Sequence, residues 1–365
     1  NAGAGTMRIS FVLPHAGSVG GIRVVAAHAE GLQKRGHEVF AVSLPFPEPG
    51  LRAVLRHLKA GRLPPRVPKG APFIDPLPIE HRVLDRVRPA VDADLPDADA
   101  VIATWWETAF AVASLSPAKG TKFHFVQHHE VFDDQPKHIV AGCYHLPLHR
   151  IAVSAWLKDV MAERYGDGDV DVVPNTVDTR LFDAPARARR RTPTVGFIYS
   201  EPHFKGTDIV LAAIARIRTR IPNLRVIAFG RERHLPRLPL PPGVEFHLRP
   251  TPDKIPSIYT ACDVFLMTSR SEGFGLPILE AMACRTPVVA SDAGCAREML
   301  ADGRAGHLVP VEDSTAVTSA AVSVLEQTPD DWRAMSSAAR ARVEGYSWDD
   351  ATALFEAALR RRVGR

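Results

Sequence analysis

The chain has few cysteines and no long hydrophobic run, and each absence narrows the possible protein classes. Its four cysteines form no C-x-x-C pair and no Cys/His array with zinc spacing. Reduced thiols in a cytoplasmic protein are the simplest interpretation. No apolar run approaches the roughly 20 residues that a membrane span needs. Residues 1–6 are small and polar, unlike the start of a signal peptide. We therefore expect a cytoplasmic protein.

The bulk composition is that of a soluble globular protein of more than one domain. A chain of 365 residues is long for one average domain and sufficient for two. Hydrophobic residues make up 45% and charged residues 24%, which is typical of globular proteins. The formal net charge of +4 is small for this length, so it does not indicate a nucleic-acid partner.

Apolar runs of strand length recur along both halves of the chain, with helical patterns between most of them. In the first half they are Arg8–Leu13, Val39–Leu44, Asp99–Thr104, Lys122–Gln127, His149–Ser154 and Val170–Pro174. In the second half they are Thr194–Ile198, Leu224–Phe229, Val244–Leu248, Cys262–Thr268, Thr286–Ala290 and His307–Val309. Two such series predict two α/β domains with parallel sheets, facing each other.

The domain boundaries follow from the stretches between these series. The Arg/Pro-rich stretch 183–193 has neither helical nor strand periodicity and is predicted to be a linker. It would separate a first domain, 7–182, from a second domain, 194–346. Residues 347–363 carry the apolar stripe of a last helix.

The stretch from Thr268 to Asp292 predicts a strand, a glycine loop, a short helix and a second strand. Such a unit presents backbone N–H groups and a helix N-terminus to a phosphate. Gly273 and Gly275 let the backbone approach a ligand closely, and Pro277 suits the first helical turn. This stretch is the first candidate site.

Two carboxylates, Glu272 and Glu280, stand at the two ends of this loop and helix. Acids beside a phosphate would repel it, so they more plausibly meet hydroxyl groups, and this points to a sugar. The alternative is a loop and helix packed into an ordinary doubly wound sheet, without a ligand.

The segment SEGFGLPILEAMA, followed by PVVASDAG, resembles the E-x7-E element of family-4 retaining glycosyltransferases. The segments LQKRGHEV and VVPNTVDTRLF resemble that family too. The resemblance implies the GT-B fold, two Rossmann-like doubly wound parallel-sheet domains facing across a cleft, with the last helix crossing back to the first domain. It further implies that Glu272 contacts the donor sugar and Glu280 the ribose. The donor diphosphate would bind the intervening amides of Gly273, Phe274, Gly275 and Leu276.

Lys205 and the glycine after it resemble the Lys-Gly pair of the same family. By this resemblance, Lys205 would neutralise charge on the leaving diphosphate. The arginine usually found about six residues earlier is replaced by Tyr199, which is expected at the same donor-binding position. Arg231, Arg233 and Arg249 are candidates to compensate, although solvated surface positions are the simpler interpretation of each.

Two segments of the first half are expected to face the donor. Gly20 and Gly21 lie at the first strand-to-helix turn, but G-x-G-x-x-G is absent and the motif is weak. Gln127 and His128 follow a strand in FVQHHE, which resembles the rhamnosyltransferase-like branch. Family-4 enzymes often place a donor-contacting histidine here, and either residue could take that place. A metal site is less plausible, because adjacent histidines point in different directions.

The proline-dense region between Pro45 and Asp97 is the least readable part of the chain. Leu51, Val54, Leu55 and Leu58 could form one helical face with basic residues around it. This face could be an acceptor-side flap or a surface that touches anionic lipid. A solvated helix and loop are an equal alternative.

The resemblance implies a metal-independent hexosyltransferase that moves a sugar from a nucleotide-sugar co-substrate to a glycan, lipid-linked or small-molecule hydroxyl, with no other cofactor. Glu272, Lys205 and His128 would be its catalytic residues. No D-x-D metal motif and no obvious nucleophile stand near the site, which suits a front-face mechanism.

The donor could be dTDP-rhamnose or a UDP- or GDP-sugar. The protein would be cytoplasmic, with peripheral contact to the inner face of the membrane as a further option. Two alternatives are an epimerase or hydrolase of this fold and a non-catalytic sugar-nucleotide-binding module.

Overall fold

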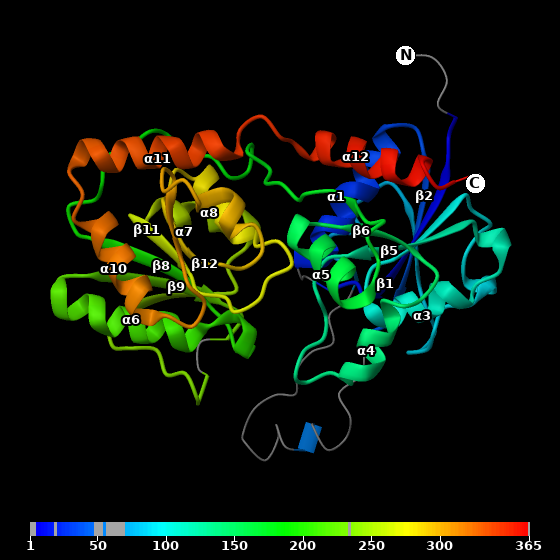
Figure 1. Cartoon of the computed structure of the whole chain (residues 1–365), viewed down its shortest axis with the longest axis horizontal. Coiled ribbons are helices and arrows are strands. Elements are labelled where there is room, and N and C mark those ends of the chain that lie inside the picture. Colours follow the sequence, from blue (N-terminus) through cyan, green and yellow to red (C-terminus); the bar gives the residue numbers. More distant parts are fainter. Residues whose placement is uncertain (1–4, 18–19, 47–53, 56–69, 233–234, 364–365) are drawn as a thin grey trace. The chain divides into compact units, whose positions relative to one another are not determined.

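The chain folds into two compact units in a computed structural model that describes residues 5–17, 20–46, 54–55, 70–232 and 235–363. Unit 1 comprises residues 1–174 and 348–365, and unit 2 comprises residues 175–347. The chain thus passes into unit 2 before residue 182, the predicted end of the first domain. Each unit is built around its own sheet (Figure 1).

The sheet of unit 1 has seven parallel strands in the order β3-β2-β1-β4-β5-β6-β7. The strands are β1 (Arg8–His15), β2 (Glu38–Leu44), β3 (Glu80–Val83), β4 (Ala100–Ala103), β5 (Thr121–Val126), β6 (His149–Ala152) and β7 (Asp171–Val172). The helices are α1 (Gly20–Lys34), α3 (Trp106–Ser114), α4 (Lys137–Cys143), α5 (Ala155–Tyr165) and α12 (Trp348–Arg360). Helices α1 and α3 lie on opposite faces of the sheet (Figure 1).

The sheet of unit 2 has six parallel strands in the order β10-β9-β8-β11-β12-β13. The strands are β8 (Thr194–Tyr199), β9 (Arg225–Gly230), β10 (Val244–Leu248), β11 (Val264–Met267), β12 (Val288–Ser291) and β13 (Gly306–Val309). The helices are α6 (Thr207–Arg220), α7 (Ile255–Thr260), α8 (Leu276–Ala283), α9 (Ala296–Leu300), α10 (Ser314–Leu325) and α11 (Pro329–Val343). The predicted α/β class with two parallel sheets is confirmed.

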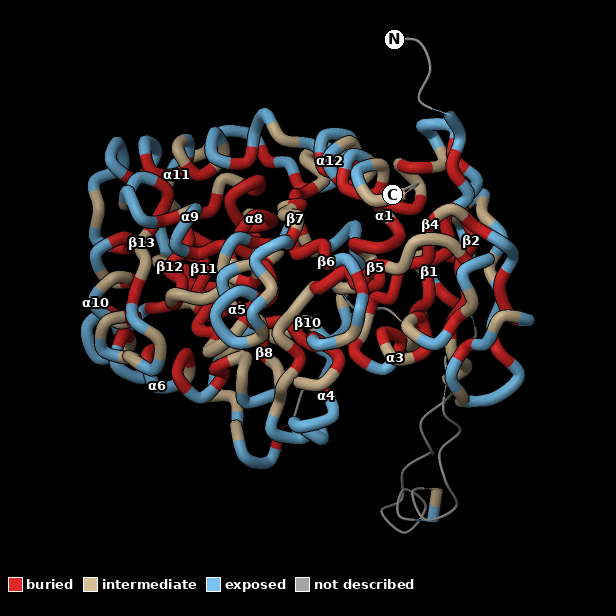
Figure 2. The backbone as a smooth tube through the Cα atoms, turned by 45° about the vertical axis from the view of Figure 1, so that its right-hand side comes forward, coloured by how far each residue is buried: buried red, intermediate tan, exposed pale blue. Residues whose placement is uncertain are grey.

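The central strands are buried on both faces, which explains why they are continuous apolar runs in the sequence. All four residues of β4 and of β11 are buried, and the same pattern runs through the other central strands (Figure 2). The edge strand β3 was not predicted. Three of its residues are exposed or nearly so in the sequence EHRV, which leaves no apolar pattern to detect.

The predicted basic amphipathic helix between Leu51 and Leu58 lies almost wholly outside the described residues. Only Val54 and Leu55 are described there, as helical residues, and the Leu55 side chain is exposed. No helix in the described part of the chain is both long enough and apolar enough to span a bilayer.

The last helix, α12, packs against α1 within unit 1 (Figure 1). The imidazole of His28 on α1 stacks on the ring of Phe355, with 4.6 Å between centroids, and Trp348 meets it edge-on. At the rim, the Arg35 guanidinium donates a 2.6 Å hydrogen bond to Glu356. The contact combines an aromatic centre with a charged edge, so the C-terminal segment is part of the core of unit 1.

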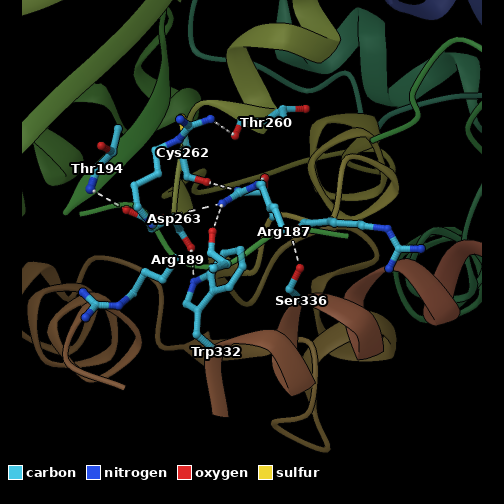
Figure 3. Close-up of polar contacts among 12 residues, drawn as sticks. Arg187, Arg189, Thr194, Thr260, Cys262, Asp263, Trp332 and Ser336 are labelled. Carbon is cyan, nitrogen blue, oxygen red and sulfur yellow. Dashed lines mark hydrogen bonds and ion pairs between the residues drawn. The ribbon is translucent and has the colours of Figure 1, made fainter. Parts of the chain in front are cut away.

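The predicted linker is fastened to unit 2 by its arginines (Figure 3). Arg187 lies 3.7 Å from the fully buried Asp263 carboxylate and stacks over the Trp332 ring at 4.5 Å. The same carboxylate accepts hydrogen bonds from the backbone N–H groups of Arg190 and Thr194, at 2.8 and 2.9 Å. One arginine of the stretch, Arg187, therefore faces a buried acid, although most of the stretch is exposed.

Arg187→Ala should destabilise unit 2 by about 3 kcal/mol, because it leaves the Asp263 carboxylate buried without its cation. Urea unfolding followed by circular dichroism measures the change in the free energy of unfolding. Arg191→Ala is the matched control, because it removes an exposed arginine of the same segment. Equal stability of the two variants would contradict the role assigned to Arg187.

The stability of unit 1 should fall as the pH drops below about 6.5, the usual pKa of histidine. Burial lowers the pKa of His28 to about 3, so the unfolded chain takes up the proton first and unfolding is favoured in acid. His124, whose pKa burial also lowers to about 3, adds to this effect. When the pH is lowered from about 7 to about 5, we expect the melting temperature of His28→Leu to fall less than that of the wild type. Identical pH profiles would show that His28 plays no part.

Candidate functional site

The candidate site of unit 2 lies where the order of its strands reverses. Strand β8 pairs with β9 on one side and with β11 on the other. In open α/β sheets, ligands bind outside the carboxyl ends of the strands at such a reversal. The loops that leave β8 and β11 there carry Lys205 and Glu272, two of the residues singled out from the sequence.

The structure brings Lys205 and Glu272 into direct contact. The Lys205 ammonium donates a 2.8 Å hydrogen bond to Oε1 of Glu272. The Ser269 hydroxyl donates to the same oxygen at 2.7 Å. Glu272 is buried, whereas about a third of the Lys205 side chain is exposed. The pair therefore places a fixed carboxylate beside a cation that solvent can reach.

A close backbone approach holds the two loops together. Gly206, just after Lys205, has φ +63°, and a Cβ there would lie 1.9 Å from the Thr268 carbonyl oxygen. The Thr268 hydroxyl donates to the Gly206 carbonyl at 2.7 Å. The backbone N–H of Arg270 donates to the Phe204 carbonyl at 2.8 Å. Only glycine fits at 206, and this fit sets the distance between Lys205 and Glu272.

Arg270 is a positioning residue that the sequence reasoning missed. Its guanidinium binds both oxygens of Asp208, at 2.8 and 2.7 Å, and also pairs with Glu312. It donates to the His203 carbonyl at 2.7 Å as well. These hydrogen bonds raise the pKa of Arg270 and lower those of Asp208 and Glu312. Because its partners lie more than 40 residues away in the chain, no local pattern could have revealed this clamp.

Glu312 also shows how firmly this clamp is built. It adopts φ +66°, a left-handed conformation that costs a residue with a side chain about 1–2 kcal/mol. Its carboxylate accepts a 2.9 Å hydrogen bond from Arg270. The charge-assisted bond offsets the backbone strain and ties the loop after β13 to the loop of Glu272.

The glycine loop leads directly into helix α8, as predicted. Gly275 precedes the helix with φ +98°, and Leu276 and Pro277 form its first turn. The Phe274 side chain is buried, and its carbonyl accepts a 2.7 Å hydrogen bond from the backbone N–H of Cys295. A Cβ at Gly294 would lie 2.3 Å from that carbonyl oxygen. The segment after β12 therefore packs against the turn from Gly273 to Leu276 and supports it.

Glu280 lies within α8 and is buried. Its Oε2 accepts a 2.9 Å hydrogen bond from the Tyr259 hydroxyl, and Tyr259 is also buried. At the other end of the element, Lys205, Ser269, Glu272 and Pro277 share the lining of a cavity of about 50 Å³. The structure thus joins Lys205, Glu272 and the start of α8 around one small space, and it places Glu280 further along the helix.

Tyr199 and two of the candidate arginines have partners within unit 2. The Tyr199 ring is in the core of unit 2, and its hydroxyl donates to the Leu238 carbonyl and accepts from the Leu235 N–H. This gives Tyr199 a packing role within the unit. Arg249 donates a 2.8 Å hydrogen bond to the Arg231 carbonyl, and Arg233 lies outside the described residues.

In unit 1 the structure places Gly21 beside Gln127. An added Cβ at Gly21 would lie 3.4 Å from the Gln127 amide, and Gly20 begins α1. The His128 ring lies 4.8 Å from that of Phe132, and its Nδ1 is 3.0 Å from the His129 carbonyl oxygen. Gly20, Gly21 and Gln127 therefore belong to one neighbourhood, and the choice between Gln127 and His128 stays open.

Gly206→Ala tests the backbone approach that holds the site. A left-handed conformation costs alanine about 1–2 kcal/mol, and the clash with the Thr268 carbonyl adds to it. We expect a total loss above about 2 kcal/mol in the free energy of unfolding. Gly303→Ala is the matched control, since Gly303 has φ +71° but no neighbouring atom within 4 Å. Equal losses in the two variants would show that the close approach is absent.

Two family models match the chain, one mainly over unit 1 and the other within unit 2. The model "Glycosyltransferase Family 4" matches residues 19–181, and "Glycosyl transferases group 1" matches residues 192–327.

Two solved structures share the fold, and they confirm the predicted GT-B class. Sucrose-phosphate synthase from Thermosynechococcus elongatus has a TM-score of 0.72, 17% identity, and coverage of 97% of this chain and 98% of that one. Anabaena HepE in complex with UDP and glucose has a TM-score of 0.72, 18% identity, and coverage of 97% and 99%.

Three relatives with known names are similar in sequence. Phosphatidyl-myo-inositol mannosyltransferase of Mycolicibacterium smegmatis is 36% identical over 54% of this chain and 53% of its own length. D-inositol 3-phosphate glycosyltransferase of Segniliparus rotundus is 32% identical over 52% and 47%. These two alignments span about half the length of each relative. The phosphatidyl-myo-inositol mannosyltransferase of Mycobacterium leprae is 30% identical over 94% of this chain and 93% of its own. With both halves matched by family models and a relative aligned almost end to end, the chain belongs to glycosyltransferase family 4.

Proposed function

We propose that this protein is a retaining glycosyltransferase that moves a sugar from a nucleoside-diphosphate sugar to a hydroxyl group of an acceptor. The observation that carries the proposal is the contact between Lys205 and Glu272 beside the N-terminal turn of α8. A cation, a helix N-terminus and a buried carboxylate are then available in one place. The cation and the helix N-terminus suit the diphosphate and its leaving oxygen, on which negative charge develops. The carboxylate suits the sugar hydroxyls, which need orientation.

The leaving diphosphate would be stabilised by Lys205 and by the start of α8. Departure of the nucleotide places negative charge on the β-phosphate, and a positioned cation is most effective where charge develops. The N–H groups of the first helical turn and the helix dipole favour the same charge. In the structure Lys205 is held by Glu272, so it is already oriented before a donor binds.

Glu272 would orient the donor sugar, and Glu280 would bind the ribose. Lys205 and Ser269 both donate to Oε1 of Glu272, which fixes the plane of the carboxylate. A fixed carboxylate accepts hydrogen bonds from sugar hydroxyls at little cost in side-chain entropy. Glu280 is likewise held by Tyr259. In unit 1, His128 and Gln127 are proposed to face the donor sugar, and Gly20 and Gly21 its phosphates or the acceptor.

Among donors, GDP-mannose is the first to test. A relative named GDP-mannose-dependent alpha-(1-6)-phosphatidylinositol monomannoside mannosyltransferase is 32% identical over 47% of this chain. HepE was solved with UDP-glucose, which makes a UDP-sugar the second candidate. The sequence FVQHHE favours dTDP-rhamnose as a third. Relatives named for inositol-containing acceptors make an inositol lipid the first acceptor to test, at the inner face of a membrane.

The rival activities are separable by product. A hydrolase or epimerase would consume the donor without an acceptor, and a binding module would leave it intact. Transfer of labelled mannose from GDP-mannose to phosphatidylinositol, measured with and without the acceptor, distinguishes all three. We propose that transfer needs no metal ion, so activity should survive EDTA.

Glu272→Ala should lower kcat at least about 100-fold, because the sugar loses the group that orients it and Lys205 loses its partner. Labelled-sugar transfer measures the rate, and circular dichroism checks that unit 2 stays folded. Glu298→Ala removes an exposed carboxylate of the neighbouring helix α9 and should leave the rate unchanged. A folded Glu272→Ala protein with wild-type kcat would refute the proposed site.

A further inference from the structure

The two carboxylate oxygens of Glu272 differ in how they are bonded. Oε1 accepts hydrogen bonds from the Lys205 ammonium at 2.8 Å and from the Ser269 hydroxyl at 2.7 Å. Each carboxylate oxygen has two lone pairs, so these two donors fill Oε1. None of the described residues donates a hydrogen bond to Oε2, and this atom is not closed off from solvent. Oε2 is therefore the atom of Glu272 that can accept a hydrogen bond from a ligand.

The two donors to Oε1 respond differently to an anionic ligand. Lys205 is charged, and about a third of its side chain is exposed. A diphosphate beside it competes with Glu272 for the same ammonium group. Ser269 is neutral and buried, and its single hydroxyl proton is donated to Glu272. The hydrogen bond from Ser269 is therefore the one that a bound diphosphate leaves in place.

The position of Ser269 is set by the strands around it. The hydroxyl of Ser291, the last residue of β12, donates to the Ser269 carbonyl. Ser269 and Ser291 are each only 3% exposed. The preceding residue, Thr268, is tied to Gly206 by its 2.7 Å hydrogen bond. The Ser269 hydroxyl is thus held by the frame of the sheet, independently of Lys205.

We propose that Ser269 is a positioning residue that keeps the Glu272 carboxylate in place while Lys205 binds the donor diphosphate. Glu272 then presents Oε2 to a hydroxyl of the donor sugar. This inference rests on the proposed function, because it takes the ligand to be a nucleoside-diphosphate sugar. It goes further in assigning separate roles to the two donors. Lys205 responds to the phosphate, and Ser269 preserves the orientation of the carboxylate.

Ser269→Ala removes this hydroxyl and leaves the Lys205 contact with Glu272 in place. With GDP-mannose and phosphatidylinositol as substrates, kcat should fall at least about tenfold, because the carboxylate loses the donor that phosphate binding does not weaken. Ser271→Ala is the matched control. Its hydroxyl lies in the same loop and makes no hydrogen bond with the described residues, so kcat should stay at the wild-type value.

Isothermal titration separates a positioning role from a general loosening of the loop. GDP should bind Ser269→Ala within about twofold of its affinity for the wild type, because the diphosphate is bound by Lys205 and the start of α8. GDP-mannose, which adds only the sugar, should bind at least about fivefold more weakly. Equal weakening for GDP and GDP-mannose would overturn the proposal. Wild-type kcat in a folded Ser269→Ala protein would overturn it too.

The same titrations with UDP and UDP-glucose, and with dTDP and dTDP-rhamnose, cover the other candidate donors. A wild type that binds one of these sugar-nucleotides but transfers no sugar would refute the proposed function. The difference in affinity between that sugar-nucleotide and its diphosphate would then still decide the role of Ser269. A wild type that binds none of them would overturn both. If Ser269→Ala does not fold, Ser291→Ala removes the hydrogen bond to the Ser269 carbonyl and should give the same pattern.

Discussion

The meeting of two loops at Gly206 and Thr268 determines the geometry of the candidate site. Neighbouring parallel strands, β8 and β11, deliver both loops to the same edge of the sheet. A 2.7 Å hydrogen bond from the Thr268 hydroxyl to the Gly206 carbonyl then joins the two loops. There is no room for a Cβ at residue 206. Because Lys205 and Glu272 flank this contact, their separation is set by the backbone. The side chains need little further ordering, which is the condition for pre-organised electrostatics.

Charge around the site is balanced in two separate groups. Glu272 is buried and needs a cation, which Lys205 supplies while remaining partly open to solvent. Arg270 neutralises Asp208 and Glu312 on the outer side of the same loops. The two cations have different roles. The fixed Arg270 holds the loops together, and the more accessible Lys205 is available to an anionic ligand. The planar guanidinium of arginine can bind several acceptors at once, which suits a clamp, whereas the compact ammonium of lysine acts as a single charge.

The two units use one topology for two kinds of surface. Each sheet reverses its strand order beside its first strand, and each presents loops at that reversal. In unit 2 the loops bring charge and a helix N-terminus together. In unit 1 they enclose a mainly apolar cavity in which Arg88 is bonded to Asp94. The chemistry of a parallel α/β sheet is thus decided by the residues that follow its strands and not by the sheet itself.

The sequence by itself determined the central strands, the glycine loop before α8 and the apolar stripe of the last helix, because burial imposes local periodicity on them. It could not determine β3, whose exposed edge carries no such pattern. Nor could it determine the Arg270 clamp or the packing of Tyr199, whose partners lie at least 36 residues away in the chain. Tertiary structure alone decided these features, because contacts between distant segments depend on how the sheets bring their loops together.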